Sequence, residues 1–156
     1  MTMPFYVAPE QVMKDRAEYA QKGIARGRSL ANLYAQYLGQ VFTHEMKPLE
    51  VEILVAELGT STRRTQLFHI AYEGTITDED RFAVLGGETG AIVEALGGSW
   101  QEGWNLADAL RASVAALAGP DRTLGPEGLE VAVLAEGNGR RAFRRLADEE
   151  LSELLA

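Results

Sequence analysis

Two helical patterns follow one another near the N-terminus, with only the basic link Arg26-Gly27-Arg28 between them. The first pattern begins at Pro9, because proline suits a first helical turn, and ends at Gly23, a common helix stop. The second follows Ser29, whose hydroxyl can cap a helix. No strand pattern lies between them, so any fold of this chain must accommodate a direct passage from one helix into the next.

The first helix carries one narrow apolar stripe. Glu10 places negative charge at the positive end of the helix dipole. The stripe itself consists of Met13, Ala17, Ala20 and Ile24. It buries little area because two of its members are alanines. Two readings remain: a peripheral helix on its own domain, which the pattern alone favours, or a helix that packs against a neighbouring subunit.

The second helix has a wider apolar face, made by Leu30, Leu33, Tyr34, Tyr37, Leu38 and Val41. No charged residue occurs between Arg28 and His44, so we expect this helix to be largely buried. Lys47-Pro48 ends the region.

Charge and composition exclude several classes of function. The 156 residues suffice for one domain with a core. The formal net charge of -8 argues against non-specific nucleic-acid binding. There is no cysteine, and two isolated histidines do not suggest a metal site, so no cofactor is predicted. No membrane-spanning run and no secretory signal is recognisable, which indicates a cytoplasmic protein.

After Pro48 the patterns alternate between strands and helices. Predicted strands cover Leu49–Leu58, Gln66–Tyr72, Arg81–Leu85, Leu129–Leu134 and Arg141–Leu146, with a turn at Glu73-Gly74 and a hairpin signal at Glu136-Gly137-Asn138-Gly139. Predicted helices cover Thr89–Leu96, closed by Gly97-Gly98, then a segment from the Asn105 cap to Gly119, and finally Asp148–Leu155 with Asp148 as cap. Hairpins beside runs of helices predict an α+β layered domain with an antiparallel sheet.

Three clusters could carry chemistry. The loop Gly86-Gly87-Glu88-Thr89-Gly90 lacks the spacing of a phosphate loop and is read as a strand-to-helix turn. Arg140, Arg141, Arg144 and Arg145 surround Phe143, which favours a surface strand that forms ion pairs, within the protein or across an interface. Asp78-Glu79-Asp80 is read as a solvated acidic turn without a histidine nearby, and His69 as a core or sheet-face residue.

Thr2 deserves separate weighing as a nucleophile. Removal of Met1 would expose an N-terminal threonine whose own amine could act as general base. Thr2 nevertheless lies on an arm with Pro4, outside any predicted strand, so a rigid site around it is not expected. On the residues alone, the chain is a non-enzymatic domain.

The order of segments resembles the alpha-type subunit of the actinobacterial 20S proteasome core. The matching stretches cover most of the chain: PEQVMKDRAEYAQKGIARGRS, SLANLYAQYLGQVFT, KPLEVEILVAEL, QLFHIAYEGTITDEDRFAVLGGETGAIVEAL and LEVAVLAEGNGRRAFRRL. The resemblance implies an Ntn-hydrolase-like αββα layered sandwich. It divides the chain into an N-terminal arm over 1–8 and a single domain over 9–156.

The resemblance also implies a role in intracellular protein degradation of the Pup–proteasome type. Members of the family form homo-heptameric alpha rings beside the catalytic beta subunits, and unfolded substrates enter through a gate. The gate would consist of Thr2, Met3, Pro4, Phe5, Tyr6 and Val7. The helix with Glu10, Met13, Ala17, Ala20 and Ile24 would lie at the ring interface, which favours the second reading of its stripe. A proteasomal ATPase activator would be a further partner.

The chain departs from the family at the join. Family members carry the first strands of the sandwich and a helix between the basic link and the SLANLYAQ helix, and here that block is absent. The sequence therefore predicts an internal deletion with its join near 27–29, and an incomplete sandwich. The lysine that receives activator C-termini lies in the missing block, which argues against docking in the usual pocket. The alternative reading is a truncated, degenerate fragment without independent activity or assembly.

Overall fold

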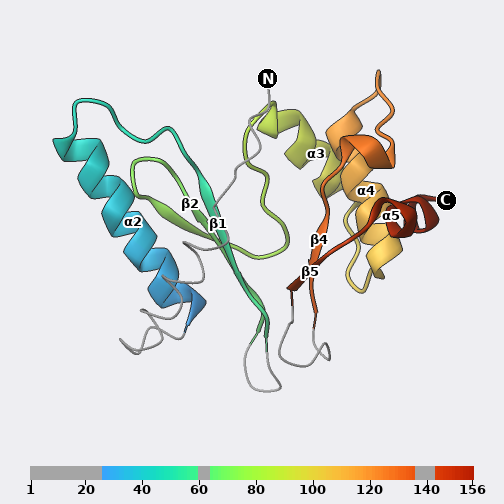
Figure 1. Ribbon diagram of the computed structural model, residues 1–156, viewed down its shortest axis with the longest axis horizontal. Helices are drawn as coiled ribbons and strands as arrows, with labels where there is room; N and C mark the ends of the chain where they lie inside the picture. Colours follow the sequence, from blue (N-terminus) through green and yellow to red (C-terminus); the bar gives the residue numbers. More distant parts are fainter. Residues whose placement is uncertain (1–25, 60–63, 136–142) are drawn as a thin grey trace. The chain divides into compact units, whose positions relative to one another are not determined.

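A computed structural model describes residues 26–59, 64–135 and 143–156 (Figure 1). The chain divides into two compact units, one that ends at Gly87 and one that begins at Glu88. The predicted arm over 1–8 and the predicted helix from Pro9 lie outside the described residues, and the single domain over 9–156 stays a prediction.

The first unit begins with one long helix on a small sheet. Helix α2 spans Gly27–His44. The sheet consists of β1 (Ile53–Glu57), β2 (Gln66–Ile70) and β3 (Ile76–Glu79), in that order, and all its pairs are antiparallel. Ile70 of β2 lies opposite Ile53 of β1 and opposite Ile76 of β3. The three apolar side chains therefore lie on the same face of the sheet.

The core of this unit lies between α2 and that face. Ala31, Ala35 and Leu38 of α2 pack on Val55, Phe68 and Ile70 of the sheet, and all six are buried. Leu30 and Tyr34 of the helix are partly buried against the same core. The prediction that the helix is largely buried is wrong, because Tyr37 is 57% exposed and Phe42 is 43% exposed. A single small sheet covers one side of a helix and leaves the other side to solvent.

A glycine allows the helix to lie close to the β2–β3 turn. Gly74 adopts a φ of +92°, in the left-handed region that favours glycine. A Cβ atom at this position would lie 2.5 Å from the carbonyl oxygen of Ala35. The predicted turn at Glu73-Gly74 is confirmed, and hydrogen bonds of 2.9 Å from Gly74 N to Ala71 O and from Ala71 N to Thr75 O close it.

The predicted strand pair in this unit is confirmed, whereas the third strand is displaced. Strands β1 and β2 fall within their predicted ranges and pair as a hairpin. Arg81–Leu85, by contrast, forms no strand, because β3 starts two residues after Gly74. The tight turn places Ile76 directly beside Ile70, so residues 76–79 pair with β2. The turn geometry therefore outweighs the strand propensity of Arg81–Leu85.

The second unit holds two helices, a hairpin and a terminal helix. Helix α3 spans Thr89–Ser99, α4 spans Leu106–Ala118, and a short 3-10 helix, η1, spans Pro126–Gly128. Strands β4 (Ala132–Leu134) and β5 (Phe143–Arg145) pair antiparallel, and α5 spans Asp148–Leu155. Leu110, Leu146 and Leu151 form the buried core of this unit.

The helix ends of this unit test the predicted caps. Asn105 caps α4, since its side-chain oxygen accepts a 2.9 Å hydrogen bond from the backbone N–H of Asp108, as predicted. The predicted stop at Gly97-Gly98 is wrong, because α3 continues through both glycines to Ser99. Asp148 is the first residue of α5 and Ala147 is its cap, so Asp148 contributes charge at the helix dipole instead of a capping bond.

Candidate functional site

None of the predicted functional residues falls in the part of the chain that the structure describes. The gate residues 2–7 and the interface residues Glu10, Met13, Ala17, Ala20 and Ile24 all precede residue 26. The same holds for the candidate nucleophile Thr2. Among the described residues are the segment 27–29, two groups of charged side chains and a hollow.

The segment 27–29, where the sequence predicts the join, forms the start of α2 and is hydrogen-bonded to the sheet. The backbone N–H of Gly27 donates a 2.8 Å hydrogen bond to Oε2 of Glu57, at the end of β1. This carboxylate satisfies a first-turn donor and places negative charge at the positive end of the helix dipole. Ser29 was expected to cap this helix, but it lies inside the first turn, and the cap position belongs to Arg26, which makes no side-chain capping bond.

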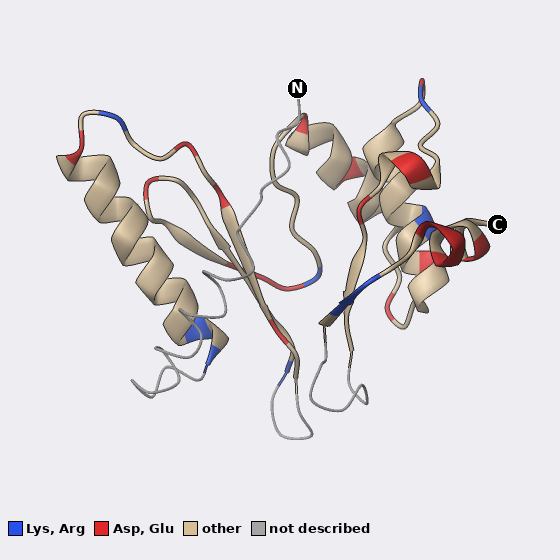
Figure 2. Cartoon of the chain, viewed as in Figure 1, with Lys and Arg blue, Asp and Glu red and all other residues tan. Residues whose placement is uncertain are grey.

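Arg28 ties the same helix end to the other strands. Its guanidinium pairs with the carboxylate of Asp78 in β3 and lies over the ring of Phe68, 4.8 Å from the centroid. Figure 2 shows basic residues gathered at this start of α2. The sequence could not reveal these contacts, because Gly27 and Glu57 are 30 positions apart and Arg28 and Asp78 are 50 apart.

A histidine lies between two carboxylates on the sheet face opposite α2. Nε2 of His69 is 3.0 Å from Oε2 of Glu52, and Nδ1 is 3.9 Å from Oε1 of Glu79. The prediction of a sheet-face histidine is confirmed. The prediction of a solvated acidic turn without a histidine is wrong, because Asp78 and Glu79 belong to β3 and Glu79 faces His69.

The basic strand β5 forms ion pairs within its own unit. Arg144 donates a 2.7 Å hydrogen bond to Oε2 of Glu150 in α5, and Arg145 pairs with Glu130. The hydrogen bond from Arg144 lowers the pKa of the Glu150 carboxyl and raises the pKa of Arg144. The reading of this strand as an ion-pairing surface is confirmed for Arg144 and Arg145, while Arg140 and Arg141 lie outside the described residues.

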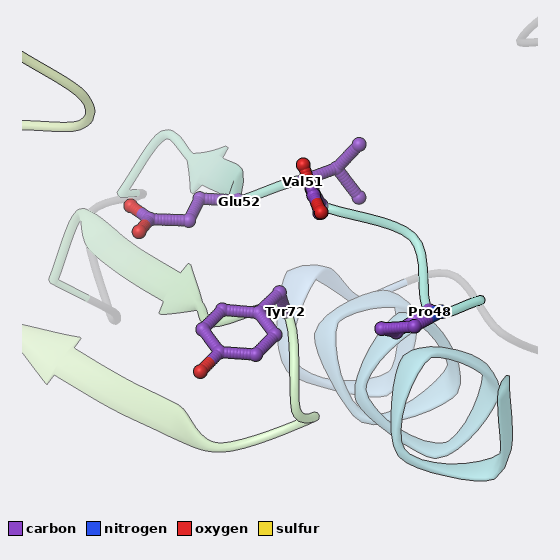
Figure 3. A pocket seen from close by; sticks show the side chains of 5 residues that line it. Pro48, Val51, Glu52 and Tyr72 are labelled. Carbon is purple, nitrogen blue, oxygen red and sulfur yellow. The ribbon is translucent and has the colours of Figure 1, made fainter. Parts of the chain in front are cut away.

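A hollow of about 460 Å³ opens where α2 leads into β1 (Figure 3). Its lining is formed by Pro48, Glu50, Val51, Glu52 and Tyr72. The ring of Tyr72 also meets Phe42 edge to face, with the centroids 5.6 Å apart. The hollow thus combines two carboxylates with an aromatic ring and two apolar residues.

Other chemistry finds little support in the described ranges. No group of three histidine or acidic side chains there is arranged to hold a metal ion. Gly86 and Gly87 both adopt positive φ, at 72° and 65°, directly before Glu88 at the N-cap position of α3. The loop therefore turns into a helix as predicted, but the strand predicted before it is absent. Within those ranges, no helix is both long enough and apolar enough to cross a membrane.

Comparison with known proteins gives a consistent answer. The chain is 41% identical to the proteasome subunit alpha of Acidimicrobium ferrooxidans over 224 residues, which cover 99% of this chain and 97% of the relative. It is 36% identical to the subunit of Sanguibacter keddieii, with 100% and 90% covered, and 34% identical to that of an Arthrobacter species, with 100% and 99% covered. No protein-family model matches the chain. The chain belongs to the family of actinobacterial proteasome alpha subunits.

Proposed function

We propose that the chain is a non-catalytic subunit of the alpha ring of a cytoplasmic proteasome core. In this role it would form a homo-heptameric ring, support the catalytic beta subunits and line the gated pore through which unfolded proteins enter. The observation that carries the proposal is the likeness to proteasome alpha subunits along nearly the whole chain. The gate would consist of residues 2–7, and the helix from Pro9 would contact the neighbouring subunit.

An internal deletion is part of the proposal. The alignment with the Acidimicrobium subunit extends over 224 residues, whereas this chain has 156, so the relative carries residues without a counterpart here. We place the join near 27–29, where α2 begins and where Gly27 and Arg28 bond directly to the sheet. A proteasomal ATPase activator is a further proposed partner, which would have to dock without the lysine of the missing block.

A peptidase assay tests the non-catalytic role. The purified chain is incubated with fluorogenic peptides, alone and after co-expression with its cognate beta subunit, and Thr2→Ala serves as the matched variant. We expect no hydrolysis by the chain alone and equal hydrolysis by the two co-expressed complexes. Hydrolysis by the chain alone that Thr2→Ala abolishes would make it an N-terminal threonine hydrolase instead.

The second candidate is a truncated fragment that no longer assembles. The exposure of Leu54, at 42% on the sheet face opposite α2, favours it, since a two-sheet sandwich buries both inner faces. Size-exclusion chromatography after co-expression separates the candidates. Co-elution with the beta subunit supports the ring role, and a lone monomer or aggregate supports the fragment.

A further inference from the structure

Exposed apolar side chains gather around the C-terminal end of α2. Phe42 and Tyr72, whose rings contact each other, are 43% and 44% exposed. Met46 and Leu49, in the segment after α2, are exposed as well. We call these four residues the Phe42–Tyr72 patch. Soluble proteins rarely leave such groups uncovered, and aromatic residues and methionine are enriched where proteins meet.

The charged residues that border this patch in the sequence are mostly acidic: Glu45, Glu50 and Glu52, against the single cation Lys47. Glu50 and Glu52 line the adjoining hollow together with Tyr72. Glu52 lies 3.0 Å from His69, whereas Glu50 is exposed and directly follows Leu49 of the patch, so we take Glu50 as the carboxylate that faces a partner. A partner that fits this surface offers an aromatic or apolar side chain next to a cation.

Strand β5 presents this chemistry. Phe143 and Arg145 are two residues apart on a strand and therefore point to the same side. Phe143 is 59% exposed, and the side chain of Arg145 remains 62% exposed although it pairs with Glu130. Part of the β5 ribbon is coloured as basic residues in Figure 2. The chain thus carries an acidic, aromatic surface in one unit and a basic, aromatic surface in the other.

We propose that the Phe143–Arg145 side of β5 in one copy docks onto the Phe42–Tyr72 patch of a second copy, with Arg145 directed at Glu50. The two surfaces differ, so the contact is heterologous, and head-to-tail contacts of this kind build a ring when the rotation from copy to copy closes. The inference rests on the proposed function and adds to it a named contact between ring neighbours. The sequence left open whether the arginines of this strand form ion pairs within the protein or across an interface. The proposed contact gives Arg145 a role across an interface.

Disulfide cross-linking tests this contact, because the chain has no cysteine of its own. Leu49→Cys and Phe143→Cys are each co-expressed with the cognate beta subunit, mixed under conditions that allow subunit exchange, oxidised and run on a non-reducing gel. We expect a product of roughly twice the 17.0 kDa chain mass in the mixture. Each variant alone, and Leu49→Cys mixed with Glu153→Cys on the exposed face of α5, should give background only.

Two results would overturn the contact. One is a mixture that cross-links no better than the Glu153→Cys control. The other is a Leu49→Cys/Phe143→Cys double variant that closes within a single chain while the mixture stays uncross-linked, which would place the contact inside one copy. Seven-fold rings without the cross-link refute this contact alone, whereas failure to form any ring with the beta subunit refutes the proposed function.

Charge reversal adds a readout that a general folding defect does not reproduce. Arg145→Glu in the Phe143→Cys copy should lower the cross-linked fraction about tenfold, as expected when a partly desolvated ion pair becomes repulsive. Glu50→Arg in the Leu49→Cys copy should then restore it. Loss without restoration would contradict the pairing of Arg145 with Glu50.

Discussion

Gly27 is the residue on which the start of α2 depends. A Cβ atom at this position would lie 2.9 Å from Cβ of Glu57 and 3.5 Å from the ring of Phe68. The glycine therefore permits the helix end to approach β1 closely enough for its N–H to reach the Glu57 carboxylate.

Gly27→Ala should lower the free energy of unfolding by roughly 1–3 kcal/mol, because the added methyl group overpacks this contact. Urea unfolding in dilute solution, where association is suppressed, measures the change. Gly98→Ala is the opposite control. Nothing lies within 4 Å of its Cβ position inside α3, so it should stabilise by about 0.5–1 kcal/mol. A neutral Gly27→Ala variant would contradict the close approach.

Ser29→Ala distinguishes the two possible caps of α2. A true N-cap serine costs about 1 kcal/mol on replacement by alanine. Since Ser29 lies within the helix, Ser29→Ala should instead be neutral or slightly stabilising. Glu57→Ala, which removes the acceptor of the Gly27 N–H, should destabilise by about 1 kcal/mol. If Ser29→Ala lowered the urea midpoint more than Glu57→Ala did, Ser29 would be the cap after all.

At the scale of elements, the close approach of α2 to the β2–β3 turn adds to the core that α2 forms with the sheet. Gly74→Ala should cost about 2 kcal/mol or more, because it combines a left-handed backbone with a clash against Ala35. Gly86→Ala separates the cost of the left-handed backbone from the cost of the clash. Its φ is +72° in the same unit but nothing lies within 4 Å, so only the backbone strain of about 1 kcal/mol should appear. Equal costs in the two variants would show that the helix does not press on the turn.

The link between β5 and α5 should respond to pH. The hydrogen bond from Arg144 lowers the pKa of Glu150 below its ordinary value of 4.5. A carboxyl with a lowered folded-state pKa stabilises the protein above its unfolded pKa, and this stabilisation is lost as the pH falls through the folded-state value. Thermal unfolding at pH values from neutral to well below 4.5 should therefore show a smaller acid loss of stability for Glu150→Gln than for the parent chain. Parallel curves would exclude a contribution from this pair.

Local signals in the sequence predicted elements better than contacts. The Asn105 cap and the β1–β2 hairpin followed from residues a few positions apart, and the structure confirms both. The strand expected at Arg81–Leu85 failed because turn geometry, not apolar content, decides which residues return beside β2. Helix α3 continues through Gly97-Gly98, because the low helix propensity of glycine is too weak by itself to end a helix.

The candidate site was less accessible to sequence reasoning. Glu57, Glu52 and Tyr72 acquire their roles only through strand register, which brings positions together that no local pattern connects. The resemblance to alpha subunits instead pointed to residues 2–24, which lie before the described part of the chain. Their roles as gate and ring-interface helix remain predictions.

At the scale of the whole molecule, membership in the alpha-subunit family gives the chain the Ntn-hydrolase-like α+β fold that its sequence predicted. The described elements are consistent with a partial version of it, since α2 covers one face of a three-stranded sheet and Leu54 is exposed on the other. We expect the chain without partners to be prone to aggregation, because this face and the Phe42–Tyr72 patch are open. Light scattering at rising concentration measures this. A soluble monomer that unfolds sharply and cooperatively would count against it.

The central claim is that the chain forms an alpha ring. Electron microscopy of the chain co-expressed with its cognate beta subunit and purified by size-exclusion chromatography tests it most directly. We predict end views with seven-fold symmetry in which this chain forms the outer rings. Particles that contain only beta subunits, with this chain recovered as monomer or aggregate, would contradict the claim.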